Sequence, residues 1–547
     1  MARTPLLRSL KRLLSDHFTA RAQGMSVEHL HEVRAAAREE RAAEGGPGAV
    51  SRRRFLVGAA AGAAALSLPR TLRAESNPTV AIVGGGIAGL TCAVELADRH
   101  IPATVYEASG RVGGRMFSNT SYWNQGQVSE WCGELIDTNH FTVRKLAQRF
   151  GLPIDNLLDA QPPGSEDTYL FSGSYYPVAA AELDFDGVSA ALSNDLHAAS
   201  YPTTFDAFTS GGQMLDRMSI YDWIETRVPG GHGSPFGKLL DVAYTIEYGA
   251  DTQDQAALNL IYLLGYQANA NSFAAFGVSD ERYHIRGGNQ ALPQVMAESL
   301  GIGTTVKLGH RLLRLGQTSA GRYSLTFQNG SATTEVVADY VVLALPFAVL
   351  RDIDYDGAGF DPLKDQAIQE LGRGHNGKLQ LQFSTRPWST SGPWPGISNG
   401  STYADTGYQA SWEASRAQAG SNGLLVLYSG GSTVDGMSTS SAFATAPSGG
   451  VNVDAQNGLT QLATVFPGIS AKWNGKATQS LPHKSSFFNA SYSYYRVGQY
   501  TDFGGYERVR QGGVLFCGEH TSTNFQGFME GGAHEGKRAA TELARLL

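Results

Sequence analysis

Hydrophobic and polar positions form a strand–turn–helix–strand pattern near residue 80. Residues 79–83 (TVAIV) are a short apolar run of β-forming residues, and residues 103–107 (ATVYE) form a second one. Between them, a glycine-rich turn at 84–89 (GGGIAG) leads into residues 90–100 (LTCAVELADRH), which have helical spacing. The pattern predicts the first βαβ unit of an α/β domain with a parallel sheet.

The glycines of this turn have the G-x-G-x-x-G spacing of dinucleotide-binding sites. Gly84 allows the tight turn, Gly86 lets a pyrophosphate approach the backbone, and Gly89 lets the helix pack closely on the strand. Ala88 stands in the first helical turn, whose N–H groups attract anions. Glu107 ends the second strand, where an acid hydrogen-bonds a ribose hydroxyl. The unit therefore predicts a bound dinucleotide.

A second alternation covers residues 377–383 (GKLQLQF). Lys378 and two glutamines share one face of this predicted strand, while two leucines and a phenylalanine share the other. The alternation fits a solvated strand face and a functional lysine equally well.

Composition sets the scale of the molecule. A chain of 547 residues with 42% hydrophobic residues exceeds one hydrophobic core, so at least two domains are expected. The net charge of −7 gives no basic footprint for nucleic acid. The three cysteines lie far apart without metal-ligand spacing, which argues against a disulfide scaffold and a zinc site.

The N-terminal region differs in character from the rest. Residues 51–56 (SRRRFL) precede an apolar run rich in alanine and glycine that is too short for a comfortable membrane span. This segment resembles a twin-arginine export signal, which implies a periplasmic or secreted protein without a stable membrane span after export. A basic linker before a buried helix is the alternative. Residues 1–50 indicate no function, and cleavage near Ala74 would use a poor site.

Several stretches resemble the FAD-dependent amine oxidase family. Residues 111–116 (RVGGRM) follow Glu107, residues 285–292 (IRGGNQAL) match a mid-chain turn of the family, and residues 338–350 (ADYVVLALPFAVL) match a later strand. The resemblance implies FAD, with Gly114 and Arg115 near the pyrophosphate and flavin and with Leu312 at the adenine.

The family also implies the domain organisation. A Rossmann-like FAD-binding domain would combine residues 78–150, 280–350 and 476–547, after an extension at 1–50 and a signal at 51–75. An interleaved α+β substrate domain would combine residues 151–279 and 351–475. The expected fold class is therefore α/β, and a homodimer stays open.

The resemblance implies the roles of three residues near the chemistry. Lys378 stands where the family has a lysine that holds a water on flavin N5 and stabilises charge on O₂. Tyr492 and Phe528 stand where two aromatic walls orient the amine. Because Ser491 replaces the cysteine of covalent flavoproteins, we expect non-covalent FAD.

The C-terminal stretch 515–540 (LFCGEHTSTNFQGFMEGGAHEGKRAA) groups acids and histidines among glycines. By resemblance, Glu519 lies near the ribityl–pyrophosphate portion, and Met529 begins a helix whose first N–H groups point at the flavin. Glu530 and His534 have i, i+4 spacing, but packing or solvation explains them better than a metal. We expect no metal.

The substrate is least determined. Residues 132–137 (CGELID) lack the arginine with which amino-acid oxidases of the family bind a carboxylate, which favours an amine. Glu130 and Glu134 could pair with a second ammonium, although Glu130 could equally be structural. The predicted reaction converts an amine and O₂ to an imine, then a carbonyl product, and H₂O₂. An L-amino-acid oxidase, a desaturase or porphyrinogen-type oxidase, and a non-catalytic FAD-binding protein stay open.

Overall fold

The computed structural model describes residues 78–267 and 273–547. The expected export signal and the extension at 1–50 lie outside the described residues. Residues Thr79–Leu547 form one compact unit.

A five-stranded parallel sheet forms the centre of the nucleotide-binding part. Its strands run in the order β22-β13-β1-β2-β9, and every neighbouring pair is parallel. Their bounds are β1 Val80–Val83, β2 Ala103–Tyr106, β9 Val306–Lys307, β13 Tyr340–Leu343 and β22 Val514–Phe516. The sheet thus draws its strands from three separate chain segments.

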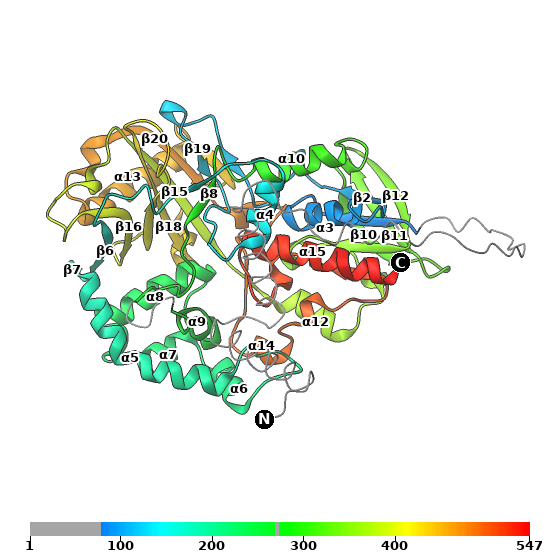
Figure 1. Cartoon of the computed structure of the whole chain (residues 1–547), viewed down its shortest axis with the longest axis horizontal. Helices are drawn as coiled ribbons and strands as arrows, with labels where there is room; N and C mark the ends of the chain where they lie inside the picture. The colour runs from blue at the N-terminus through cyan, green and yellow to red at the C-terminus, as the bar shows by residue number, and fades with distance from the viewer. Residues whose placement is uncertain (1–77, 268–272) are drawn as a thin grey trace, which may run out of the picture. The chain divides into compact units, whose positions relative to one another are not determined.

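Both faces of this sheet are buried, as parallel sheets require. Ile82 packs into a core with the helices α3 (Ile87–Ala97), α4 (Phe141–Arg149), α10 (Ala291–Leu300) and α15 (Met529–Leu546). Ala81 and Val83 face the opposite core, built with β10 (Arg311–Gln317), β11 (Tyr323–Asn329), β12 (Ala332–Ala338), α11 (Phe347–Leu350) and α12 (Pro362–Glu370). Figure 1 shows this antiparallel β10–β12 layer beside the helices.

Helices α3 and α15 pack side by side through glycines (Figure 1). A Cβ at Gly536 would lie 2.2 Å from the Ala88 carbonyl oxygen, and one at Gly532 would lie 2.8 Å from the Ile87 side chain. The absence of side chains lets the two helices approach closely. Consequently the N-termini of α3 and α15 lie close to each other.

An eight-stranded sheet forms the second part, in the order β19-β20-β15-β18-β17-β16-β6-β7. The bounds are β6 Glu166–Phe171, β7 Ser174–Tyr176, β15 Asn376–Phe383, β16 Ser398–Ala404, β17 Ala410–Glu413, β18 Gly423–Gly430, β19 Phe443–Thr445 and β20 Trp473–Ser480. Strand β20 crosses position 475, where the sequence suggested a boundary.

Helices cover both sides of this sheet. Helix α13 (Gly449–Val465) packs on one side with Leu379 and Leu381. A helical core with Trp223 and Leu239 lies on the other side, built from α5 (Val178–Ala199), α6 (Ser210–Asp216), α7 (Ile220–Arg227), α8 (Pro235–Tyr248) and α9 (Ala257–Leu264) (Figure 1). The remaining strands and α-helix are β3 Ser118–Asn119, β4 Ser129–Glu130, β5 Ile154–Asn156, β8 Tyr283–Ile285, β14 Gly372–Arg373, β21 Ser493–Tyr494 and α14 Gln499–Asp502.

The alternating strand with Lys378 is not a solvated edge. Strand β15 is buried along its whole length, because it lies between β18 and β20. Gln380 and Gln382 are fully buried, and the Gln380 amide donates to the Glu130 carbonyl at 2.7 Å. The solvated alternative for this polar face is therefore wrong.

Among the described residues, we find no helix with the length and apolar character needed to cross a membrane.

Candidate cofactor and substrate site

A cavity of about 720 Å³ is lined both by the first βαβ unit and by the large sheet. The carboxyl ends of β1 and β2 open into it at Gly84 and Glu107, as expected for ligands of parallel sheets. Lys378 of β15 lines the same cavity. Residues far apart in the sequence thus face one cavity.

The glycine turn leaves room for a ligand at the start of α3. Gly84 has a φ of +111°, and a Cβ there would lie 2.5 Å from the Ala344 carbonyl oxygen. Gly86 lines the cavity, and a Cβ at this position would meet no described atom within 4 Å. No side chain of the described chain caps α3, so its first N–H groups, near Ala88, stay available for an anion.

Glu107 is fixed at the end of β2. Its Oε2 accepts from the Gly85 N–H at 2.7 Å, and its Oε1 accepts from the Ser109 N–H at 2.8 Å. The carboxylate lines the cavity and keeps lone pairs for a ribose hydroxyl. Leu312 of β10 lines the cavity with His310 and Arg311.

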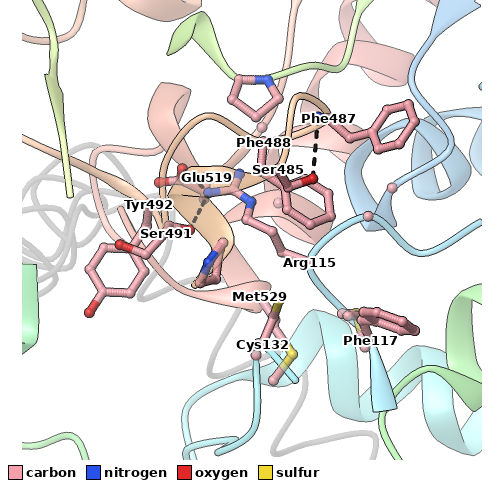
Figure 2. A pocket seen from close by; sticks show the side chains of 18 of the residues that line it. Arg115, Phe117, Cys132, Ser485, Phe487, Phe488, Ser491, Tyr492, Glu519 and Met529 are labelled. Carbon is pink, nitrogen blue, oxygen red and sulfur yellow. Dashed lines mark hydrogen bonds and ion pairs between the residues drawn. The ribbon is translucent and has the colours of Figure 1, made fainter. Parts of the chain in front are cut away.

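Figure 2 shows Arg115 between Glu519 and Ser491. The Arg115 guanidinium lies 2.8 Å from Glu519 Oε1 and donates to the Ser491 carbonyl at 2.9 Å. Burial acts to raise the pKa of Glu519, but the charge of Arg115 and the hydrogen bonds from Arg115 and Ser493 outweigh it, so the pKa lies below its usual value. The ionised Glu519 also accepts from the Gly527 N–H at 2.9 Å and so holds the turn before α15.

Helix α15 presents its N-terminus to the cavity. Phe528 is its N-cap and has no side-chain cap bond within the described structure, and Phe528 and Met529 both line the cavity with Gly114. Glu530 points elsewhere, since its carboxylate accepts from the Thr142 and Val143 N–H groups at 2.9 Å. Glu530 therefore caps α4, and no cluster of metal-binding side chains occurs in the described ranges.

His520 is a cavity residue that the sequence interpretation left without a role. It is 2% exposed, and neither ring nitrogen has a hydrogen-bond partner within residues 78–267 and 273–547. Burial lowers its pKa to about 4, so the imidazole is neutral and can donate one hydrogen bond. An unpartnered buried histidine, a glycine cradle and two uncapped helix N-termini together fit a phosphate-bearing dinucleotide such as FAD.

On the other side of the cavity, Lys378 lies directly opposite Tyr428 of β18 in the sheet register. Its Nζ donates to the Cys132 carbonyl and lies 2.7 Å from Glu134 Oε2. The Tyr428 hydroxyl lies 3.0 Å from the Tyr492 hydroxyl, which donates to the Ile246 carbonyl at 2.8 Å. The lysine and the predicted cage tyrosine thus belong to one connected wall.

Comparison with known proteins identifies the family. Residues 87–544 match the model of the flavin-containing amine oxidoreductase family. The chain belongs to this family. It is therefore an oxidoreductase with a flavin cofactor, as the resemblance implied.

Relatives within the family have different named activities. Pseudooxynicotine dehydrogenase of Pseudomonas sp is 25% identical over 91% of this chain and 96% of its own. The putative L-amino-acid oxidase YobN of Bacillus subtilis is 24% identical over 87% of this chain and 96% of its own. Polyamine oxidase 2 of Arabidopsis thaliana is 23% identical over 85% of this chain and 88% of its own.

Solved structures share the fold. Cyclohexylamine oxidase from Brevibacterium oxydans superposes with a TM-score of 0.71 at 18% identity, over 86% of this chain and 99% of its own. Putrescine oxidase bound to putrescine superposes with a TM-score of 0.70 at 18% identity, over 86% of this chain and 99% of its own. The expected α/β fold class is confirmed.

Within this family fold, the two acids considered for substrate binding are already engaged. Glu130 is fully buried, does not line the cavity, and accepts from the Ser118 hydroxyl and the Asn289 N–H. Glu134 does line the cavity, but Lys378 and the Trp412 indole N–H bind its two oxygens. Glu130 is not placed to contact a substrate, and Glu134 already has a cation as partner.

Other acids, which the sequence interpretation missed, face the cavity. Glu247 at the end of α8 and Glu281 before β8 both line it, and the described residues offer neither carboxyl group a hydrogen-bond or ion-pair partner. Desolvation is the largest cause that raises the pKa of Glu247 to about 8, and repulsion by Glu281 and Asp137 adds to it. Desolvation and Asp137 also raise the pKa of Glu281, although this residue is exposed on the cavity wall and solvent weakens the effect there. No motif in the sequence distinguished these acids, because only the folded chain brings α8 and β8 to one cavity.

Aromatic side chains complete this end of the cavity. Tyr492 and Phe528, which the sequence analysis expects as two aromatic walls, both line it, and a Cβ at Gly527 would lie 3.9 Å from the Tyr492 ring. The sequence interpretation missed several further aromatic residues that line it, namely Tyr248, Phe276, Tyr403, Trp412 and Tyr428. Four of them lie in strands or a helix and Phe276 lies in a turn, all positions where aromatic residues commonly pack in a core, so sequence alone gave no signal.

Proposed function

We propose that this enzyme oxidises an amine without an α-carboxylate, using non-covalently bound FAD and O₂. The observation that carries the proposal is the pair of unpartnered carboxyl groups, Glu247 and Glu281, on the cavity wall. A substrate carboxylate would face these acids, whereas an ammonium group would be attracted by them.

The arginines that line the cavity support the same choice. Arg115 is paired with Glu519, and Arg111 donates to the Gly114 carbonyl and stacks on Phe117. Arg311 adjoins Leu312 at the predicted adenine end. The arginines of the lining therefore belong to the dinucleotide segments and leave no bidentate partner for a substrate carboxylate.

The roles of the chain's own residues follow from this wall. Tyr492 and Phe528 confine the amine and limit the water around it. The acids Glu247 and Glu281 bind a second basic nitrogen of the substrate, which makes diamines better substrates than monoamines. Bound FAD supplies the two-electron acceptor, so that the amine becomes an imine, which water hydrolyses, and O₂ becomes H₂O₂. Lys378 provides the positive charge beside the reacting O₂.

A spectroscopic screen tests this function. Heat or acid denaturation should release all of the flavin, because Ser491 offers no thiol for attachment. Under anaerobic conditions, monoamines and diamines should bleach the flavin absorbance, and admission of air should restore it with formation of H₂O₂. Bleaching by α-amino acids alone would instead identify an amino-acid oxidase, and no bleaching by any amine would refute the proposal.

We also propose that the protein is exported in folded form through the twin-arginine signal at residues 51–56. The support is the SRRRFL motif followed by a short apolar run.

A further inference from the structure

The Glu134 carboxylate holds two groups that line the cavity. Its Oε2 lies 2.7 Å from Lys378 Nζ, and its Oε1 accepts from the Trp412 indole N–H at 2.9 Å. The side chains of Lys378 and Glu134 are only 8% and 7% exposed. Such a buried pair depends on its geometry, because neither charge is well hydrated.

Three separate pieces of chain fix the Lys378 ammonium. Strand β15 carries the lysine, the turn at 132–134 supplies Glu134 and the Cys132 carbonyl, and β17 supplies Trp412. The ammonium also lies 5.4 Å from the centre of the Trp412 ring. The lysine therefore has little freedom to reorient during a reaction.

The pairing also changes the charge that O₂ meets. A carboxylate 2.7 Å from an ammonium offsets most of its field at longer range. O₂ accepts one hydride equivalent and one proton per turnover and leaves as H₂O₂, and a nearby positive charge stabilises the negative charge that it carries after the first electron. An uncompensated lysine would therefore accelerate this step more than a paired one.

We propose that Glu134 is a positioning residue that fixes the Lys378 ammonium and limits the positive charge available to O₂. This inference rests on the proposed oxidase function. It gives Glu134 a role in the reaction with oxygen and not in binding a second substrate ammonium.

The test compares three variants of the FAD-loaded enzyme, reduced by light without substrate and mixed with O₂ in a stopped-flow instrument. Glu134→Gln should raise the second-order rate constant of reoxidation by roughly three- to tenfold, because it leaves the ammonium uncompensated. Lys378→Met should lower it by about the same factor, because it leaves a carboxylate. The double variant should react within about threefold of the wild type, since both charges are absent.

The double variant keeps the test informative if Glu134→Gln alone fails to fold, because it leaves no unpaired buried charge. The midpoint potential of the bound flavin gives a second measurement, and it should be highest in Glu134→Gln and lowest in Lys378→Met.

A matched control is available on β17. Glu413 is also buried, and its carboxylate also binds a cation and an indole, Arg386 at 2.6 Å and Trp388 at 2.8 Å, but it does not line the cavity. Glu413→Gln should leave both the reoxidation rate and the flavin potential unchanged.

Two results would overturn the inference. One is a Glu134→Gln enzyme that reoxidises no faster than the wild type. The other is a double variant as slow as Lys378→Met. Failure to bind FAD at all, or to be reduced by any amine, would count against the proposed function and is recognised before O₂ is admitted.

Discussion

At the scale of single residues, Glu247 and Glu281 are the acids through which the proposed function links the cavity to substrate choice. Desolvation and repulsion by Glu281 and Asp137 raise the pKa of the partly buried Glu247, whereas Glu281 is exposed on the cavity wall, so solvent weakens the same effect there. With a pKa of about 8, the Glu247 carboxyl group is largely protonated at pH 6.5 and ionised at pH 9. Attraction for a second ammonium should therefore grow as the pH rises.

This gives a pH prediction for specificity. Between pH 6.5 and 9, the ratio of kcat/KM for a diamine to that for a monoamine of equal length should rise by roughly three- to tenfold. Both values come from steady-state assays. Their ratio removes any pH effect on the oxidised amine group that the two substrates share. Glu247→Gln should flatten the ratio, and a wild-type ratio that stays constant over this range would refute the role of the acids.

Glu247 also affects the stability of the protein without substrate. A carboxyl group whose pKa is raised on folding binds more protons in the folded than in the unfolded state, so its contribution to stability falls as the pH rises from about 4.5 to about 8. Glu247→Gln should thus have the same melting temperature as the wild type at low pH and a higher one at pH 9.

At the scale of elements, the N-termini of α3 and α15 form the anion-binding end of the cavity. The two helices reach the same space because glycines separate them, as at Gly536 against the Ala88 carbonyl. Of the described residues, none caps either N-terminus with its side chain. N–H groups without partners cost stability, and an anionic group of a bound cofactor would satisfy them.

Two glycines of one motif should therefore respond differently to alanine. Gly86→Ala adds a Cβ that meets no described protein atom but enters the cavity, so the apo-protein should melt as the wild type does while FAD affinity falls roughly ten- to a hundredfold. Gly89→Ala places a Cβ 2.0 Å from the Gly84 carbonyl oxygen, which should destabilise the apo-protein itself by about 1–3 kcal/mol or more.

Thermal melts of apo-protein and FAD titrations by fluorescence quenching measure both effects. Equal loss of apo-protein stability in the two variants would contradict the assigned difference between them.

At the scale of the whole molecule, the cofactor site needs most of the chain. The parallel sheet combines segments around residues 80, 340 and 515, and the large sheet brings Lys378 and Trp412 to the same cavity. FAD should therefore bind after the chain has folded. An exported enzyme of this kind must acquire its cofactor before export, which suits a pathway that carries folded proteins.

Substitution of the paired arginines tests this export. In a bacterial host, Arg52→Lys combined with Arg53→Lys should keep the enzyme in the cytoplasm in FAD-loaded form, whereas the wild type should reach the periplasm with its flavin. Cell fractionation and flavin absorbance provide the measurement. Arg54→Lys leaves the pair intact and serves as the control, and normal export of the doubly substituted protein would contradict the signal.

The sequence determined the local units whose signals are short in range. The strand, glycine turn and helix at 79–100 follow from spacing and backbone sterics, and the family resemblance placed Glu107, Arg115, Lys378 and Tyr492 on the cavity that the structure shows. It also correctly gave the α/β fold class and the family. Each of these conclusions needs only neighbouring residues or a motif.

Tertiary structure decided the rest, because charge and burial depend on residues distant in the chain. The sequence singled out Glu134 only as a possible partner of a substrate ammonium, and only the approach of β15 and β17 gives it Lys378 and Trp412 as partners. Glu247 and Glu281 face the cavity because the end of α8 and the segment before β8 meet there. Long-range contacts of this kind arise only when the chain has folded, so the sequence could not reveal which acids face the cavity.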